Sequence, residues 1–162
     1  MSPLNQDFPL PMVEYPEYSP GLEGIIAGES AISRIDSERN RLLIRGYDLV
    51  DLTENVSFEE VAYLLLHTDL PSDSQLSDFG AQLRQQRDLT EEVLAILRSV
   101  PPFTHPMTLL RTAVSSLGHS DPDAGDDSHD ANVRKAIRLL AKVPTILTTA
   151  HRLALGQTPV EP

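Results

Sequence analysis

The stretch DANVRKAIRLLAKVPTILTTAHRLALG, from Asp130 to Gly156, decides the fold of this chain. Its apolar residues recur at spacings of three and four, which places them on one face of a helix. The eight residues between Lys142 and His151 carry no charge. A helix that is apolar, or small and polar, around its whole circumference is normally covered on more than one side. The apolar face consists of Ala136, Ile137, Leu140, Val143, Leu147 and Ala150.

Two interpretations of this helix remain open from its residues alone. It is either the core helix of a single domain or a helix packed between its own domain and a partner subunit. Pro144 removes one backbone hydrogen bond, so we expect a kink near residue 140 or a break there.

The segment HPMTLLRTAVSSLG, residues 105–118, predicts a second helix that packs on two sides. Pro106 suits the first helical position, and Gly118 suits the position just past the end. Met107, Leu110, Val114 and Leu117 form one stripe, while small hydroxyl side chains on the other faces allow close approach of a neighbour. We expect helices over about 106–117 and 130–155 to pair as a helical hairpin.

Upstream, three short amphipathic helices are predicted over about 57–67, 73–87 and 90–100. Ser57 and Glu60 have the spacing of a capping box at the start of the first. Phe58 is among the residues expected on its inner face. Thr90 is suited to cap the third helix, which Pro101 and Pro102 end.

The N-terminal part has a different character. Residues 1–20 contain five prolines and predict an extended arm. Residues 31–45 predict a small β-hairpin whose four-residue loop spans 37–40. The fold class indicated for residues 21–162 is therefore all-α and multi-helical, with a small N-terminal hairpin.

The composition excludes several classes of function. The 24 acidic and 13 basic residues give a net charge of -11, which disfavours nucleic-acid and anionic-membrane surfaces. There is no cysteine, so disulfides and thiolate metal sites are excluded. No apolar run reaches the roughly 20 residues of a membrane span, and the start lacks the features of a signal peptide. We expect a soluble, cytoplasmic protein.

Four patterns invite a chemical function, and none meets its requirements. The glycines at 21, 24 and 28 lack the lysine and hydroxyl of a phosphate loop, and Ser30 lacks the second glycine of a nucleophile elbow. Residues 119–130 hold five aspartates and two histidines without calcium-loop spacing, so a solvated, mobile loop is the better interpretation. The remaining histidines have no metal or triad spacing, and His105 immediately precedes a helix start, where we expect a capping or packing role. They are His67, His105 and His151. We therefore assign no catalytic, cofactor-binding or metal-binding residue.

Five blocks of the chain together resemble the citrate synthase family. They are GLEGIIAGESAISRID, LLIRGYDLVDL, SFEEVAYLLLH, HPMTLLRTAVSSLG and RLLAKVPTI, and they occur in the family's order and spacing over residues 21–162. The resemblance is to the shorter, bacterial-type branch, which also contains the 2-methylcitrate synthases. It implies a mostly helical fold and the N-terminal part of the large domain.

The resemblance also implies an activity and a partner. Citrate synthases condense acetyl-CoA with oxaloacetate through an aspartate base and assisting histidines, a reaction of the tricarboxylic acid cycle. The family's blocks that bear those residues have no counterpart in this chain, so no catalytic residue carries over and no cofactor is expected to bind this segment. The implied partner is a second copy, through helices 106–117 and 130–155. The expected dimer interface is Met107, Leu110, Val114, Leu117, Leu140, Val143, Leu147 and Ala150.

Three hypotheses follow for the chain as a whole. The first is a portion of an acyl-CoA-condensing enzyme that serves as scaffold and dimerises. The second is a free-standing helical assembly module without catalysis. The third is one half of a split citrate or 2-methylcitrate synthase, which needs the C-terminal part of the enzyme as its partner.

Overall fold

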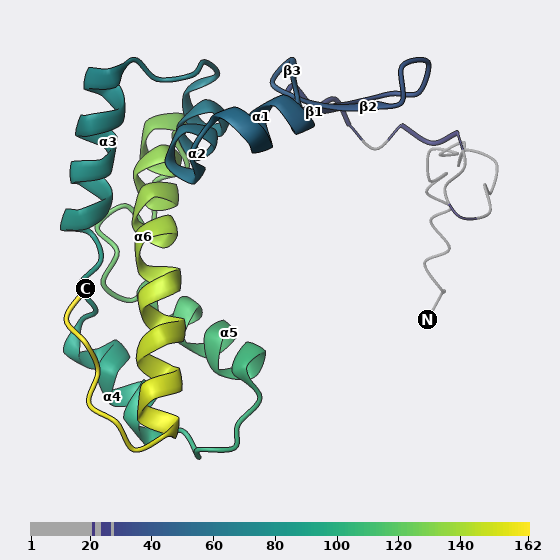
Figure 1. Cartoon of the computed structure of the whole chain (residues 1–162). Coiled ribbons are helices and arrows are strands. Elements are labelled where there is room, and N and C mark those ends of the chain that lie inside the picture. Colours follow the sequence, from purple (N-terminus) through teal and green to yellow (C-terminus); the bar gives the residue numbers. More distant parts are fainter. Residues whose placement is uncertain (1–20, 22–23, 27) are drawn as a thin grey trace, which may run out of the picture. The chain divides into compact units, whose positions relative to one another are not determined.

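The computed structural model describes residues 21, 24–26 and 28–162, and the Pro-rich segment 1–20 lies outside the described residues. The chain divides into a unit of residues 1–31 and a unit of residues 32–162. The few described residues of the first unit include Gly21 and Gly24, both with positive φ. The second unit contains every helix and strand of the described residues (Figure 1). It is multi-helical with a small sheet at its N-terminal side, which confirms the predicted fold class.

The small sheet has three antiparallel strands in the order β1-β2-β3. These are β1 (Ser33–Asp36), β2 (Arg41–Ile44) and β3 (Tyr47–Asp48). The loop between β1 and β2 contains Asn40 at a φ of 53°, a conformation that asparagine tolerates. The sequence did not predict β3. It follows a two-residue turn in which Arg45 and Gly46 both have positive φ, as a tight hairpin requires.

Helix α1 (Leu49–Asn55) was also missed, since the sequence analysis placed the first helix after it. Asp48 is the N-cap of this helix, and its carboxylate accepts a hydrogen bond of 2.8 Å from the Val50 N–H. Leu52 is its single buried residue. A seven-residue helix with one buried side chain leaves almost no periodic signal in the sequence.

Three short helices follow: α2 (Phe58–His67), α3 (Asp73–Gln85) and α4 (Glu91–Ser99). The Ser57–Glu60 capping box is confirmed, and a second box joins Ser72 to Gln75 at the start of α3. Thr90 occupies the cap position of α4 but makes no side-chain capping bond. The expectation for Phe58 was wrong. It is the first residue of α2 and is 68% exposed, because the core side of this helix is formed by Ala62 and Leu64.

The last two helices are α5 (Pro106–Leu117) and α6 (His129–Ala154). Pro106 starts α5 as expected. Helix α6 continues through Pro144, so the expected alternative of a break there was wrong. One turn later, the Thr148 hydroxyl donates a hydrogen bond of 3.0 Å to the Pro144 carbonyl. Packing on both halves of α6 holds the helix together where the proline N–H is missing.

The core lies along α6 in two clusters (Figure 1). In the first, α2 and α3 pack on the first half of α6; in the second, α4 and α5 pack on its second half. The largest fully buried side chains include Phe79 in the first cluster and Ile146 in the second. The first cluster is Ala62, Phe79, Leu83, Ile137 and Ala141, and the second is Val93, Leu97, Ala113 and Ile146.

Candidate assembly surface

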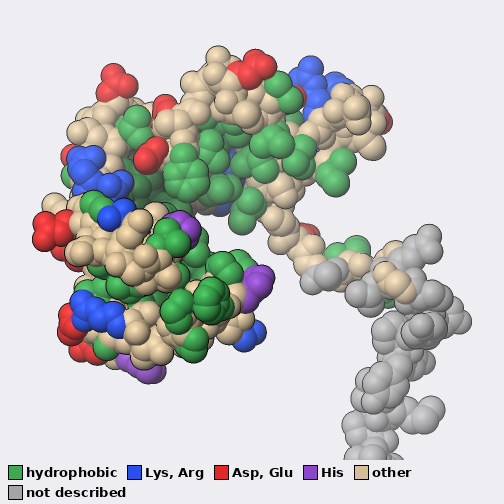
Figure 2. All heavy atoms as spheres, turned by 60° about the horizontal axis from the view of Figure 1, so that its bottom comes forward, with side chains coloured by type: hydrophobic (Ala, Val, Ile, Leu, Met, Phe, Trp, Pro, Cys, Tyr) green, Lys and Arg blue, Asp and Glu red, His purple; other side chains and the backbone are tan. Residues whose placement is uncertain are grey.

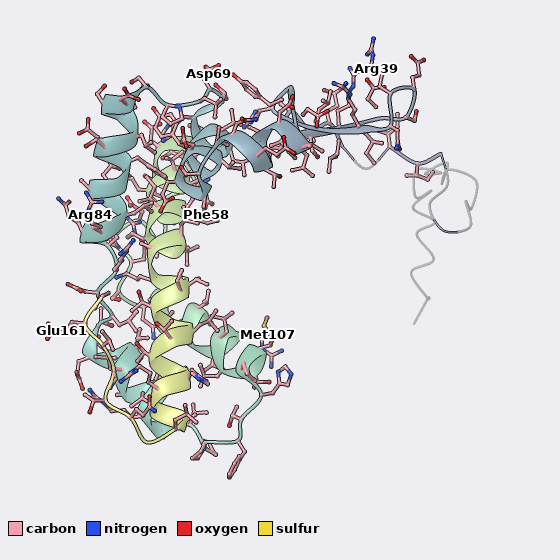
Figure 3. All side chains as sticks on the ribbon, viewed as in Figure 1. Arg39, Phe58, Asp69, Arg84, Met107 and Glu161 are labelled. Atoms are coloured by element: carbon pink, nitrogen blue, oxygen red, sulfur yellow. The ribbon has the colours of Figure 1, made fainter. Side chains whose placement is uncertain are left out.

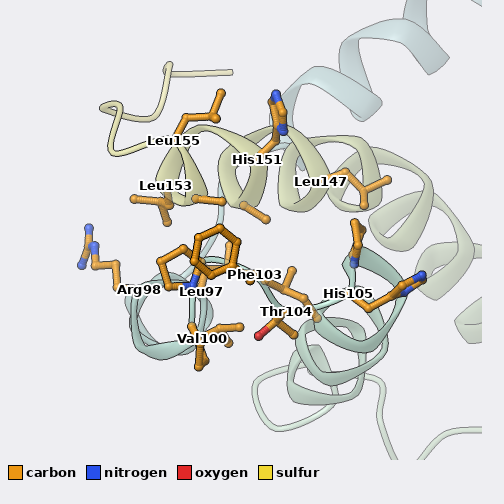
Figure 4. Close-up of a pocket in the computed structure, with 16 residues that line it drawn as sticks. Leu97, Arg98, Val100, Phe103, Thr104, His105, Leu147, His151, Leu153 and Leu155 are labelled. Carbon is orange, nitrogen blue, oxygen red and sulfur yellow. The ribbon is translucent and has the colours of Figure 1, made fainter.

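An apolar groove lies where the second half of α6 meets α4 and α5; we call it the end groove. It has a volume of about 910 Å³ and is bounded by the end of α4, the loop 100–105, the start of α5 and the last turns of α6 (Figure 4). Its lining is mostly aliphatic and aromatic, with Leu97 at its base among buried core residues. Phe103 belongs to the lining and is fully exposed to solvent. The groove is therefore a surface on which an apolar partner can be buried.

Exposed apolar side chains extend the groove onto α5 and α6. Met107 is 61% exposed and Leu147 is 38% exposed. In Figure 3 the side chain of Met107 stands at the start of α5 and points away from α6. Figure 2 looks toward the end of the molecule where α6 finishes, and hydrophobic side chains gather there while charged ones lie toward the margins. We call Met107, Leu147 and the end groove together the α5–α6 surface.

The structure divides the eight residues of the expected dimer interface into two groups. Only Met107 and Leu147 are exposed. The other six are partly buried, and most of them pack onto the chain's own core. Leu140 packs against the first cluster, and four pack against the second: Leu110, Val114, Leu117 and Ala150. Val143 is partly buried without belonging to either cluster.

Two of the polar side chains at the groove, His105 and Arg98, have partners within the chain. His105 is the N-cap of α5, and its Nδ1 accepts a hydrogen bond of 3.2 Å from the Met107 N–H, which confirms the capping role expected for it. Arg98 pairs with Glu91 at 2.5 Å. Within the described part of the chain, no group of three or more histidine, aspartate or glutamate side chains is placed to hold a metal ion. The groove is therefore better suited to packing than to acid–base or metal chemistry.

We expected the loop between α5 and α6 to be solvated and mobile, and the structure shows two of its aspartates bound to α6. Arg138 donates to Asp121 at 2.7 and 2.9 Å and to Asp123 at 2.7 Å. Arg134 donates to Asp123 at 2.6 and 3.1 Å. The pKa of Asp123 is held far below its usual range by hydrogen bonds from Arg134 and Arg138. Burial is the largest single influence on Asp121 and would raise its pKa, but hydrogen bonds from Arg138 and from the Asp123 N–H, together with the charge of Arg138, lower that pKa.

These ion pairs, like β3 and α1, were not predicted from the sequence. Arg134 and Arg138 are four residues apart, so they lie on one helical face, and Asp121 and Asp123 are two apart in a turn. Both spacings can be read from the sequence. What the sequence does not give is the path of the loop, which brings the turn back over the first half of α6.

The helices also bear on membrane association. In the part of the chain that the structure describes, no helix combines the length and apolarity needed to cross a bilayer.

Comparison with known proteins places these features in one family. The family model described as "Citrate synthase, C-terminal domain" matches residues 21–162. A citrate synthase of Mycolicibacterium smegmatis is 41% identical over 149 residues, covering 92% of this chain and 40% of that protein. A citrate/2-methylcitrate synthase of Bacillus subtilis is 38% identical over 151 residues, covering 93% of this chain and 41% of that protein.

Solved structures agree with the sequence matches. The crystal structure of citrate synthase from Pyrobaculum aerophilum is 31% identical, with a TM-score of 0.80 over 88% of this chain and 38% of that one. Citrate synthase from Thermotoga maritima is 32% identical, with a TM-score of 0.75 over 88% of this chain and 36% of that one. The chain thus spans about two fifths of the length of these relatives.

Proposed function

The chain belongs to the citrate synthase family, and on this premise we propose that it is the scaffold and dimerisation part of a citrate synthase-like enzyme. The reaction of that enzyme would be the condensation of acetyl-CoA with oxaloacetate to give citrate and CoA. In this proposal the chain supplies packing surfaces and no reacting group. We infer that the aspartate base and the assisting histidines of such an enzyme would lie in the part of the polypeptide that this chain does not match.

The observation that carries the proposal is the α5–α6 surface. Met107, Leu147 and Phe103 are exposed around an apolar groove of about 910 Å³. Apolar surface of this kind on a water-soluble protein usually marks an interface, because its burial is favourable by about 25 cal/mol per Å². A contact between two identical α5–α6 surfaces would be isologous, so each copy would bury the same residues.

The expected geometry of the dimer combines exposed and half-buried residues. Met107 and Leu147 would make the first contacts, while the half-buried Leu110, Val114 and Val143 would lose their remaining exposure. The acidic character of the chain works against association at low ionic strength, since both copies carry a charge of -11. Self-association should therefore strengthen as salt is raised toward about 0.15 M.

Sedimentation equilibrium over a range of protein concentrations tests this proposal. The wild-type chain should form dimers, and Met107→Asp combined with Leu147→Asp should weaken dimerisation by at least tenfold. Val160→Asp is the matched control, because Val160 is about as exposed as Met107 but lies in the C-terminal tail. A wild-type chain that stays monomeric at high concentration would refute the dimerisation role.

One observation favours the alternative of a free-standing assembly module. Each core cluster joins three helices of this chain, so the unit has an interior of its own. An assay of CoA release from acetyl-CoA and oxaloacetate separates catalysis from assembly. We expect no turnover by the isolated chain, whether it is a module or one half of a citrate or 2-methylcitrate synthase. Turnover on adding the remaining part of a relative would favour the split enzyme over the module.

A further inference from the structure

The two faces of the small sheet differ in chemistry. Strand pairing places Ser33 opposite Ile44, Ile35 opposite Leu42, and Ile44 opposite Tyr47. Residues that pair directly share a face, and alternate residues of one strand also share a face. One face therefore carries Ser33, Ile35, Leu42, Ile44 and Tyr47, which we call the apolar sheet face. The opposite face carries Arg34, Asp36, Arg41, Leu43 and Asp48.

Three of the four charged side chains on the opposite face, those of Asp36, Arg41 and Asp48, have partners within the chain. Arg41 pairs with Asp48 at 3.4 Å across β2 and β3. Asp36 is buried and accepts hydrogen bonds of 3.1 Å from both the backbone and the side chain of Arg39. These contacts hold the β1–β2 loop and satisfy Asp36, Arg41 and Asp48 within the chain itself.

The apolar sheet face is uncovered. Ile35 is 78% exposed, and Leu42 and Tyr47 are also exposed. No charged side chain lies on this face. A hairpin of two short strands is marginally stable in water, and β3 adds only two residues to it, so packing against the apolar face would stabilise this sheet. The sheet therefore has the properties of a surface that is buried in an assembly.

We propose that the apolar sheet face docks the part of a citrate synthase-like polypeptide that this chain does not match. The inference rests on the proposed function and names the surface of contact. Over its 88% coverage of this chain, the Pyrobaculum aerophilum structure uses only 38% of its own length. In that fold, a unit like this one is therefore accompanied by a larger amount of further polypeptide, which is available to cover exposed apolar faces.

Interface size argues against a second copy as the occupant. Stable protein–protein interfaces bury roughly 800 Å² on each partner and use about 20–30 residues a side. The apolar sheet face has five residues. A patch this small does not hold two separate copies together, but it suffices as one part of a longer contact with a chain segment that packs elsewhere on the same unit.

Co-expression with a complement tests the proposal. The 162-residue chain would be tagged and produced together with the portion of the Mycolicibacterium smegmatis citrate synthase that it does not match. The wild-type chain should retain this portion as a one-to-one complex. Ile35→Asp and Leu42→Asp should each lower its recovery by roughly tenfold or more. Amide hydrogen exchange over residues 33–48 should slow in the complex relative to the chain alone.

A crossed control separates this inference from the proposed function. Met107→Asp should weaken self-association and leave recovery of the complement unchanged, while Ile35→Asp should do the reverse. Because Ile35 is mostly exposed, the thermal midpoint of Ile35→Asp should stay within about 2 °C of wild type. Leu42→Ser, a milder change, should lower recovery in the same direction.

Three results would overturn the inference. They are failure of the wild-type chain to retain the complement, unchanged recovery with both Ile35→Asp and Leu42→Asp, and loss of self-association in Ile35→Asp. The last result would assign the apolar sheet face to a second copy of the chain.

Discussion

The two halves of α6 have similar cores and opposite surroundings. The first half packs on α2 and α3, and its outer side is covered by the loop that Arg134 and Arg138 bind through Asp121 and Asp123. The second half packs on α4 and α5, yet its outer side carries the exposed Leu147 and the end groove. A loop of the chain binds to the first half, whereas the second half adjoins an apolar groove.

This difference shows how one helix serves folding and assembly together. The buried residues of both halves stabilise the unit. Both halves carry an exposed apolar side chain, Leu139 on the first and Leu147 on the second, but only the second half adjoins the end groove. Charge marks the distinction, since the eight residues from Val143 to Ala150 have none, whereas the first half contains both arginines.

The largest expected effect on the free energy of unfolding comes from truncating a buried side chain in either cluster. Phe79→Ala in the first and Ile146→Ala in the second should each lower the free energy of unfolding by about 2–5 kcal/mol, through lost burial and the cavity left behind. Urea unfolding of the two variants in dilute solution measures this. Similar losses would show that both clusters are complete without a partner. A loss below about 1 kcal/mol for Ile146→Ala would mean that the second cluster needs one.

Removing the ion pairs should cost less. Arg138→Ala should lower the free energy of unfolding by about 1–3 kcal/mol, because it leaves Asp121 and Asp123 short of a charged donor in a partly covered site. Arg134→Ala is the matched control. Arg134 is 51% exposed against 17% for Arg138, so its loss should matter less. Equal effects in the same urea titrations would contradict the argument from burial.

Low pH should weaken the contacts of Asp123 with the first half of α6. The pKa of Asp123 in the folded chain lies below its ordinary value of 3.8, because hydrogen bonds from Arg134 and Arg138 favour the carboxylate. Its stabilising contribution is therefore fully present above that ordinary value and is lost as pH falls below it. Thermal midpoints measured from about pH 6 to pH 3 should fall more steeply for wild type than for Asp123→Asn. Parallel curves would exclude this linkage.

The smallest expected effect on stability is that of a substitution at Met107. Met107→Asp should change the free energy of unfolding of the dilute chain by no more than about 0.5 kcal/mol, since Met107 is mostly exposed. Chemical denaturation below the dimerisation range would measure it. A loss as large as that for Ile146→Ala would show that Met107 stabilises the monomer and has no separate role in assembly.

Much of the helical framework could be predicted because local signals agreed with it. The periodicity of residues 130–156, the proline at 106 and the Ser57–Glu60 box each act within one or two turns. Helix α1 and strand β3 escaped because a seven-residue helix with one buried leucine and a two-residue strand have no periodic pattern to detect. Phe58 was misplaced because its spacing fits the apolar stripe, while its position in the first turn leaves it beyond the packed region.

The candidate surface was predictable only in part, for a different reason. Periodicity says which side chains share a helical face, but it does not say whether that face meets the same chain or another molecule. Leu110 and Leu140 pack internally, while Met107 and Leu147 from the same stripes stay exposed. The pairing of Arg138 with Asp121 likewise depends on a loop path that spans 17 positions of sequence.

Pro144 lies between Ala141, in the first cluster, and Ile146, in the second. It therefore places a missing backbone donor at the boundary between two separately packed regions. Local opening should start or stop at this joint more readily than at any point inside a cluster. Slowly exchanging amides in α6 should then form two blocks, each with its own opening free energy, although the helix is continuous in space. The two halves of α6 would thus open as separate units, although they form one continuous helix.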